Sequence, residues 1–132
     1  MSDSTTHAGT AATHSAGPTD AHHGAIGADL EDCITGCLAC QAICLQTMYH
    51  CLKVGGARAG PDHIRTLLDC AALCGASVQF MLAESPFQGR LCALCAEACR
   101  ECEAACRRMG DVTDLRCADS CRRCAEMLPH AA

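Results

Sequence analysis

The sequence predicts an all-α protein, an antiparallel up-down-up-down four-helix bundle with a cysteine-lined core. Two observations support this fold class. The 15 cysteines of the 132-residue chain recur mostly at steps of three and four residues, the spacing of one face of an α-helix. Glycine and proline divide residues 29–132 into four helical segments joined by short turns, and short turns favour antiparallel neighbours.

The clearest helix is expected over about residues 86–109. Ser85 and Pro86 form a helix start signal, and Gly110 ends the segment. Between them, one face carries only sulfur, from Cys92, Cys95, Cys99, Cys102 and Cys106. The other faces carry glutamate and arginine, which suit water. This helix therefore directs thiols, where leucine is usual, toward its partner helices.

The first helix is expected over about residues 29–54, with Asp29 as N-cap and the glycine-rich turn of residues 55–60 after it. Its inward row is Cys33, Cys37, Cys40, Cys44, Thr47 and Cys51, in which only the threonine lacks sulfur. Because the remaining residues of this helix carry almost no charge, it should be covered on more than one face.

The second and fourth helices complete the expected bundle. Pro61 suits a first helical position and starts the segment of about residues 61–84, whose inward row is His63, Leu67, Cys70, Cys74, Ser77 and Met81. Asp111 and Asp114 start the segment of about residues 112–128, whose inward row is Cys117, Cys121, Cys124 and Leu128. The four helices form one domain, residues 29–132.

Residues 1–28 are expected to be a disordered N-terminal tail, because they are rich in Ser, Thr, Ala and Gly without periodicity. Their histidines, His7, His14, His22 and His23, are solvated residues or transient metal contacts. The tail has no Lys or Arg and no apolar run, so no secretory signal is expected, and no stretch is expected to span a membrane. A cytoplasmic location with reduced thiols follows.

Disulfides do not fit the cysteine pattern. Side chains four residues apart on a helix have Cβ atoms about 5–6 Å apart, whereas a disulfide needs roughly 3.5–4.5 Å.

Three other classes of protein are also disfavoured. The net charge of −5 and the aromatic content of 2% argue against nucleic-acid binding. No nucleophile–base–orienter set is readable, so an enzyme is not expected. No ferredoxin-type cysteine run ending in proline is present.

Metal binding is the chemistry that this pattern favours. Six cysteine pairs have the spacing Cys-x-x-x-Cys, so two thiolates one helical turn apart can converge on one ion. Soft thiolate ligands select Cu(I), zinc or Fe–S clusters. The candidate ligands are all 15 cysteines: Cys33, Cys37, Cys40, Cys44, Cys51, Cys70, Cys74, Cys92, Cys95, Cys99, Cys102, Cys106, Cys117, Cys121 and Cys124.

Charge separates the candidate metals. One Cu(I) per thiolate leaves the core neutral, whereas zinc on four thiolates leaves a charge of −2, and uncompensated buried charge costs several kcal/mol per ion. We therefore expect multiple Cu(I) ions per chain, on the order of one per thiol. The alternative is a zinc or thiol redox buffer of metallothionein-like role, which metal titration would distinguish.

Two further expectations concern the ends and faces of the bundle. In an antiparallel bundle, one end gathers Met48, His50, His63, Met109 and Asp114. The thioether and imidazole groups of the first four suit metal uptake. From Cys33 to Leu52 no residue carries a formal charge, and the second helix is nearly as apolar. These two helices are therefore the expected interface of a homo-oligomer.

Three segments, ITGCLACQAICLQT, ESPFQGRLCALCAEACRECEAAC and CADSCRRCAEM, resemble the bacterial copper storage proteins. The resemblance covers about residues 29–128. It implies a four-helix bundle assembled as a tetramer, with inward thiols that store Cu(I) against toxicity or for supply to enzymes. Lacking a twin-arginine signal, the chain resembles the cytosolic branch of that family. A storage role also makes a copper chaperone a candidate partner.

Overall fold

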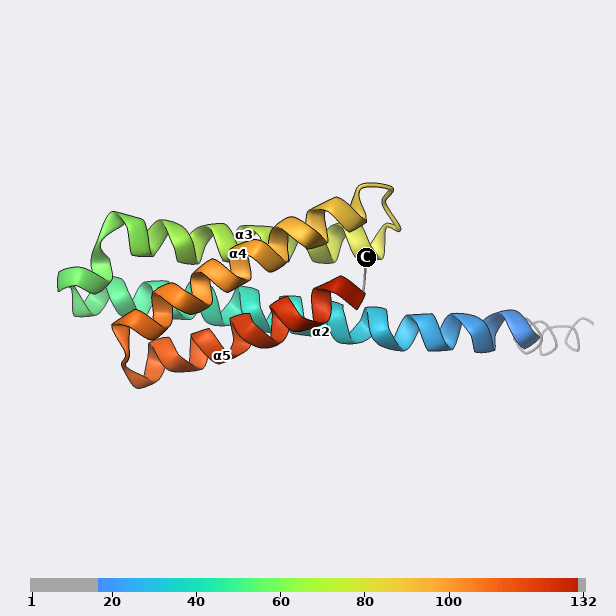
Figure 1. The fold of residues 1–132 in the computed structure, drawn as a ribbon, viewed down its shortest axis with the longest axis horizontal. Helices are drawn as coiled ribbons and strands as arrows, with labels where there is room; N and C mark the ends of the chain where they lie inside the picture. The colour runs from blue at the N-terminus through green and yellow to red at the C-terminus, as the bar shows by residue number, and fades with distance from the viewer. Residues whose placement is uncertain (1–16, 131–132) are drawn as a thin grey trace, which may run out of the picture.

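The computed structural model describes residues 17–130. Within them lie the helices α2 (Gly17–Val54), α3 (Pro61–Leu82), α4 (Gln88–Met109) and α5 (Val112–Met127) and the 3-10 turns η1 (Gly56–Ala59) and η2 (Leu128–His130). Each helix packs against the one that follows it, and α5 packs back against α2. The result is the predicted antiparallel up-down-up-down four-helix bundle (Figure 1).

Local sequence accounts for the turns. Gly55 and Gly56 have φ of 79° and 66° after α2, and Pro61 starts α3. Gly110 ends α4 in the left-handed conformation, with φ of 82°. The Asp111 side chain then caps α5 by accepting the Asp114 backbone N–H at 2.8 Å. Before α4, Ser85 Oγ accepts the Phe87 N–H at 3.1 Å, and the helix begins at Gln88 rather than at residue 86.

The start of α2 differs from the prediction. The helix begins at Gly17 rather than near Asp29, and its first turns project past the other three helices (Figure 1). Residues 17–28, which the sequence assigned to the tail, belong to α2 in the structure, and the rest of the tail, residues 1–16, lies outside the described residues. A helix that is already nucleated in the packed bundle extends at the cost of one residue at a time, so this segment needs no nucleus of its own.

The core lies along the axis of the bundle. The predicted inward rows of all four helices are buried, including the second row with His63, Leu67, Ser77 and Met81. Glutamate and arginine of α4 and α5 lie on the outside, where Arg107 pairs with Glu103 and Asp119. Met81 and Leu128 are fully buried toward the end opposite the α2–α3 turn.

Helix α3 tests the expectation that no stretch of the chain could span a membrane. Among the described helices, it alone is long and apolar enough to cross a membrane by length and composition, with a mean hydropathy of 1.2 over 18 residues. The expectation that no stretch meets this criterion is therefore wrong. The core helix of a soluble protein meets it too, and the residues that α3 buries inside the bundle, such as Leu67, Cys70 and Val78, raise its hydropathy.

Candidate metal centre

Each of the 15 cysteines is buried and none forms a disulfide. Their sulfur atoms meet across the bundle, with Sγ–Sγ distances of 3.5 Å for Cys37–Cys124, 3.6 Å for Cys70–Cys99 and 3.7 Å for Cys44–Cys117. Thiols that sequence reasoning could assign only to helix faces therefore touch thiols of other helices.

The sulfur atoms form groups that share members. One group takes a thiol from each helix: Cys40, Cys74, Cys99 and Cys124. Two others are Cys40, Cys44, Cys70 and Cys121, and Cys44, Cys102, Cys117 and Cys121. A group of three contains Cys37, Cys74 and Cys95. Because Cys40, Cys44, Cys74 and Cys121 each belong to two groups, these groups form one continuous column of sulfur atoms along the core rather than a set of separate sites. We call this column the sulfur file.

Burial raises the pKa of the thiols near the two ends of the bundle and so keeps them protonated. It raises the pKa of Cys51 to about 12, with the carboxylate of Asp114 adding to the effect. Burial likewise raises the pKa of Cys92 to about 11 and that of Cys33 above its usual value. Cys33 donates its S–H to the Met127 carbonyl at 3.1 Å. A metal that binds thiolates here must displace these protons.

A different set of donors closes the file at the end where α2 meets η1. Cys51, His63 and Asp114, which we call the mouth cluster, come from α2, α3 and α5, and their ligand atoms lie within 4.8 Å of one another. Cys51 Sγ donates to Asp114 Oδ1 at 3.6 Å, and His63 Nε2 lies 3.4 Å from the same oxygen. Burial and the neighbouring Asp111 raise the pKa of Asp114.

Arg58 of η1 covers the mouth cluster from outside. Its Nε lies 3.2 Å from Asp114 Oδ2 and 3.1 Å from Asp111 Oδ2, and its Nη2 donates to the Met109 carbonyl at 3.1 Å. Sequence reasoning placed Asp114 at this end but did not name it or Arg58 as site residues. Their roles depend on contacts between separate elements, for which the sequence carried no local signal.

The four residues predicted for metal uptake do not all lie at one site. His63 joins the mouth cluster, and Met109 lines a cleft of about 310 Å³ beside it, between the start of α3 and the end of α4. Met48 packs partly buried against the core. His50 instead pairs with Asp111 at 3.2 Å on the surface, because it lies one position off the inward row of α2.

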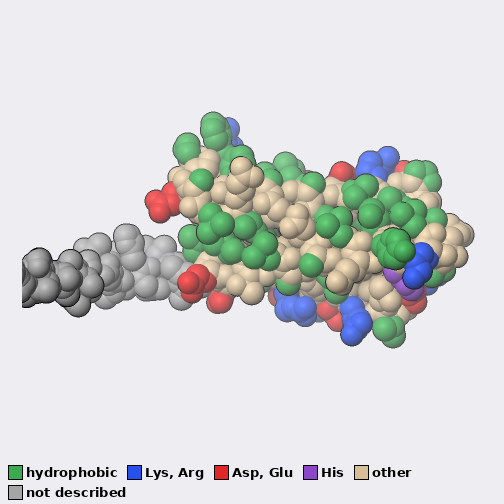
Figure 2. Space-filling model, turned by 180° about the vertical axis from the view of Figure 1, so that it is seen from behind, with side chains coloured by type: hydrophobic (Ala, Val, Ile, Leu, Met, Phe, Trp, Pro, Cys, Tyr) green, Lys and Arg blue, Asp and Glu red, His purple; other side chains and the backbone are tan. Residues whose placement is uncertain are grey.

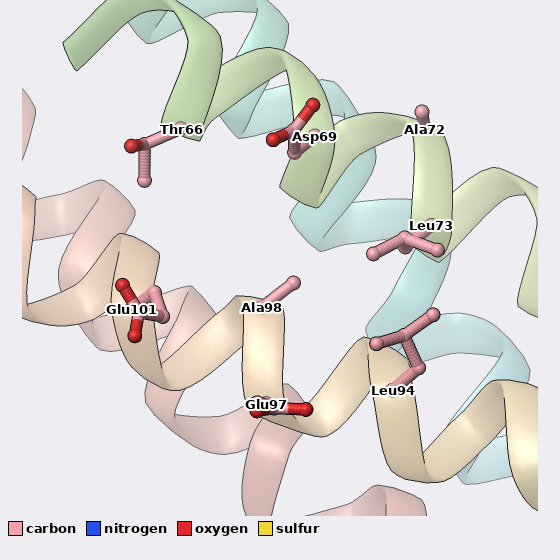
Figure 3. A pocket seen from close by; sticks show the side chains of 8 residues that line it. All are labelled: Thr66, Asp69, Ala72, Leu73, Leu94, Glu97, Ala98 and Glu101. Carbon is pink, nitrogen blue, oxygen red and sulfur yellow. The ribbon is translucent and has the colours of Figure 1, made fainter. Parts of the chain in front are cut away.

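One groove on the outside of the bundle does not belong to the metal centre. It is a groove of about 590 Å³ between α3 and α4, lined by residues such as Asp69, Leu73, Leu94, Glu97 and Glu101 (Figure 3). Its lining contains no cysteine. The sulfur file is therefore enclosed within the bundle and separate from this outer groove.

Fold and site together define a class: a helix bundle whose core is a continuous thiol file able to hold several soft metal ions. Comparison with known proteins identifies the family to which the chain belongs. The copper storage protein family profile matches residues 27–131. The chain therefore belongs to the copper storage protein family, as its motifs predicted.

Individual relatives cover most of the bundle. The Nmul_A1745 protein of Nitrosospira multiformis is 36% identical, with a TM-score of 0.75 over 80% of this chain and 96% of that one. The Cu(I)-bound copper storage protein BsCsp3 of Bacillus subtilis is 32% identical, with a TM-score of 0.72 over 76% of this chain and 94% of that one. The cysteine-rich protein YhjQ of Bacillus subtilis is 33% identical over 73% of this chain and 89% of its own length.

Proposed function

We propose that this protein stores Cu(I), many ions per chain, on the thiolates of its bundle core, for copper detoxification or supply. Two observations carry the proposal: all 15 cysteines are buried and free, and neighbouring sulfur groups in the core share members. Each of the 15 is a proposed ligand. The role is sequestration and release of an ion, so we propose no catalysed reaction.

Charge and chemistry favour Cu(I) for this core. A file of thiolates with one monovalent ion each is neutral, whereas zinc on each four-thiolate group leaves −2 in a buried place. The structural relative BsCsp3 is Cu(I)-bound. A zinc or thiol redox buffer of metallothionein-like role is accordingly not favoured. Binding also ties four helices together, which stabilises a core built of small side chains.

Copper would reach the file at the mouth. The cleft of about 310 Å³ that His63 and Met109 line opens beside the mouth cluster. We propose these two residues as uptake ligands, with Met48 next inward because it packs on the core. His50 takes a lesser part, since Asp111 holds it at the surface.

Assembly and location complete the proposal. Several large apolar residues of α2 stay exposed, among them Leu38, Leu45, Tyr49 and Leu52, and Leu68 extends this surface on α3. Figure 2 shows hydrophobic side chains gathered along this face of the bundle. We propose that α2 and α3 form the interface of a homotetramer, and that the protein works in the cytoplasm with a copper chaperone as delivery partner.

Anaerobic titration tests the storage function. Reduced apoprotein is titrated with Cu(I) against bicinchoninate as competing chelator. The expected saturation is on the order of one ion per thiol, with release of protons as thiols become thiolates. Protein alkylated with iodoacetamide is the control and should bind almost none. Saturation at a few ions per chain would refute storage by the whole file.

A further inference from the structure

The mouth cluster differs in chemistry from the sulfur file that it closes. It offers one sulfur, one imidazole nitrogen and one carboxylate oxygen, whereas the other groups of potential ligands among the described residues offer sulfur alone. Cys51, His63 and Asp114 belong to three different helices, and all three are buried. A mixed, buried donor set of this kind is unnecessary for a thiolate store.

The His63 ring is the donor of this cluster that the protein satisfies least. Its side chain is 4% exposed, and neither ring nitrogen has a hydrogen-bond partner. Nε2 lies 3.4 Å from Asp114 Oδ1 without forming a hydrogen bond. A buried polar group without a hydrogen-bond partner is destabilising, so an ion that takes the ring as a ligand removes that cost.

We propose that, in the copper-free protein, Cys51, His63 and Asp114 bind one Zn²⁺ ion per chain at the mouth, where Cys51 and His63 also serve Cu(I) once copper enters. The spacing of the donors fits a tetrahedral ion. Bond lengths of about 2.3 Å to sulfur and about 2.0–2.1 Å to nitrogen and oxygen give tetrahedral edges of about 3.5 Å for S–O and about 3.3 Å for N–O. The corresponding distances in the structure are 3.6 Å and 3.4 Å.

Charge and ligand type also select a divalent ion. A Cys51 thiolate, the Asp114 carboxylate and a neutral imidazole balance Zn²⁺ to zero, whereas Cu(I) at the same place leaves −1 and gains a hard oxygen ligand. The four-cysteine groups have Sγ–Sγ distances such as 3.7 Å for Cys40–Cys121, which also suit a tetrahedral ion, but zinc there leaves −2. The first Zn²⁺ therefore goes to the mouth.

The surroundings of the cluster supply the rest of a zinc site. Asp114 Oδ1 faces the other two donors, while Oδ2 is held by Arg58 at 3.2 Å. Such an outer hydrogen bond orients a ligating carboxylate. Three protein ligands leave the fourth position for water, and the cleft that His63 lines gives water a path. This single ion ties α2, α3 and α5 together at the open end.

X-ray absorption at the zinc edge tests the proposal on the full-length, reduced apoprotein with one equivalent of Zn²⁺. The expected shell has one sulfur at about 2.3 Å and three nitrogen or oxygen atoms at about 2.0 Å. A shell of four sulfurs would place zinc in the core, and a shell without sulfur would place it on histidines elsewhere. Either result overturns the proposal. Cu(I) capacity is measured separately, so the storage function can stand or fall by itself.

Variants locate the site. His63→Ala and Asp114→Asn should each weaken the binding of the first Zn²⁺ by more than tenfold in competition with a zinc chelator. Asp62→Asn is the matched control, because it removes a carboxylate from the same end whose partner is Arg65, and should bind zinc like the wild type. Unchanged first-equivalent affinity in His63→Ala, with helix content intact by circular dichroism, overturns the assignment.

Discussion

At the scale of single residues, Thr47 is the break in the sulfur row of α2. It is fully buried, and its Oγ1 has no hydrogen-bond partner. The sequence already placed Thr47 between Cys44 and Cys51 in this row, so its inward position was predictable. Threonine and cysteine are similar in size, and a thiol at this position would lie in line with the file.

Replacing this hydroxyl with a thiol should therefore extend the store. We expect Thr47→Cys to bind about one more Cu(I) per chain than the wild type, since capacity follows the number of thiolates. The measurement is the anaerobic Cu(I) titration against a competing chelator. Thr47→Val is the control of similar shape and should keep the wild-type capacity. Equal capacity in Thr47→Cys and Thr47→Val would mean that the file does not accept a ligand here.

The two histidines near the α2–α3 turn show where single-residue prediction fails. Sequence reasoning assigned His50 and His63 to the same end, which is their position in the structure. Their side chains nevertheless go to different places: His63 to the mouth cluster and His50 to Asp111. The carboxylate beside His63 is Asp114 of α5, and the partner of His50 is Asp111, just before α5. Only the packing of α5 against α2 and α3 could therefore decide between them.

At the scale of elements, the turns have clear local causes. Gly110 separates α4 from α5 and adopts φ of 82°, with its N–H donating to the Cys106 carbonyl. Left-handed backbone costs an ordinary residue roughly 1–2 kcal/mol, so glycine is the natural choice. The sequence predicted this break correctly. It could not predict the early start of α2, because the residues of that segment show no apolar periodicity.

Substitution of Gly110 measures the contribution of this turn. We expect Gly110→Ala to lower the free energy of unfolding of the reduced apoprotein by about 1–2 kcal/mol, because a Cβ atom disfavours the left-handed conformation. Urea denaturation followed by circular dichroism provides the value. Gly110→Asn should lose less, since asparagine tolerates this conformation better. Equal stability of the glycine and alanine proteins would contradict the proposed strain.

At the scale of the whole molecule, the outer surface has an apolar side and a charged side. Exposed leucines gather on α2, whereas α4 and α5 carry most of the charge. The charge distribution was readable from the sequence, because residues 33–52 contain no formal charge. What the structure adds is that Leu38 and Leu45 remain 49% and 41% exposed after the core is filled. The single bundle therefore leaves this face uncovered.

Charged substitutions on this face should reduce assembly. We expect the double variant Leu38→Glu, Leu45→Glu to shift the proposed tetramer to smaller species in sedimentation velocity, because it places carboxylates in the proposed apolar interface. The double variant Leu94→Glu, Leu115→Glu is the control, with similar exposures of 49% and 37% on α4 and α5. An interface elsewhere would leave the first variant assembled.

The pH dependence of the apoprotein follows from its buried thiols. The pKa is raised by burial to about 12 for Cys51 and to about 11 for Cys92, against 9.0 in an exposed thiol. Because the folded state holds these protons more tightly, the stability that they contribute is present below pH 9.0 and is lost as pH rises toward 11–12.

Anaerobic urea denaturation in the presence of reductant should therefore give a lower free energy of unfolding at pH 10 than at pH 7. Cu(I)-loaded protein should depend less on pH over this interval, because its ligating thiols are already deprotonated. Constant stability of the apoprotein across the interval would show that the buried thiols titrate as they do in the unfolded chain.

The sequence by itself determined the four helical segments, their inward rows and the soft-metal chemistry, because helical periodicity and residue type are local properties. Only the tertiary structure decided which thiols of different helices form shared groups, and that Cys51, His63 and Asp114 converge beneath Arg58. The physical reason is that contacts between helices depend on their relative rotation and axial register. The spacing within one helix does not specify either quantity.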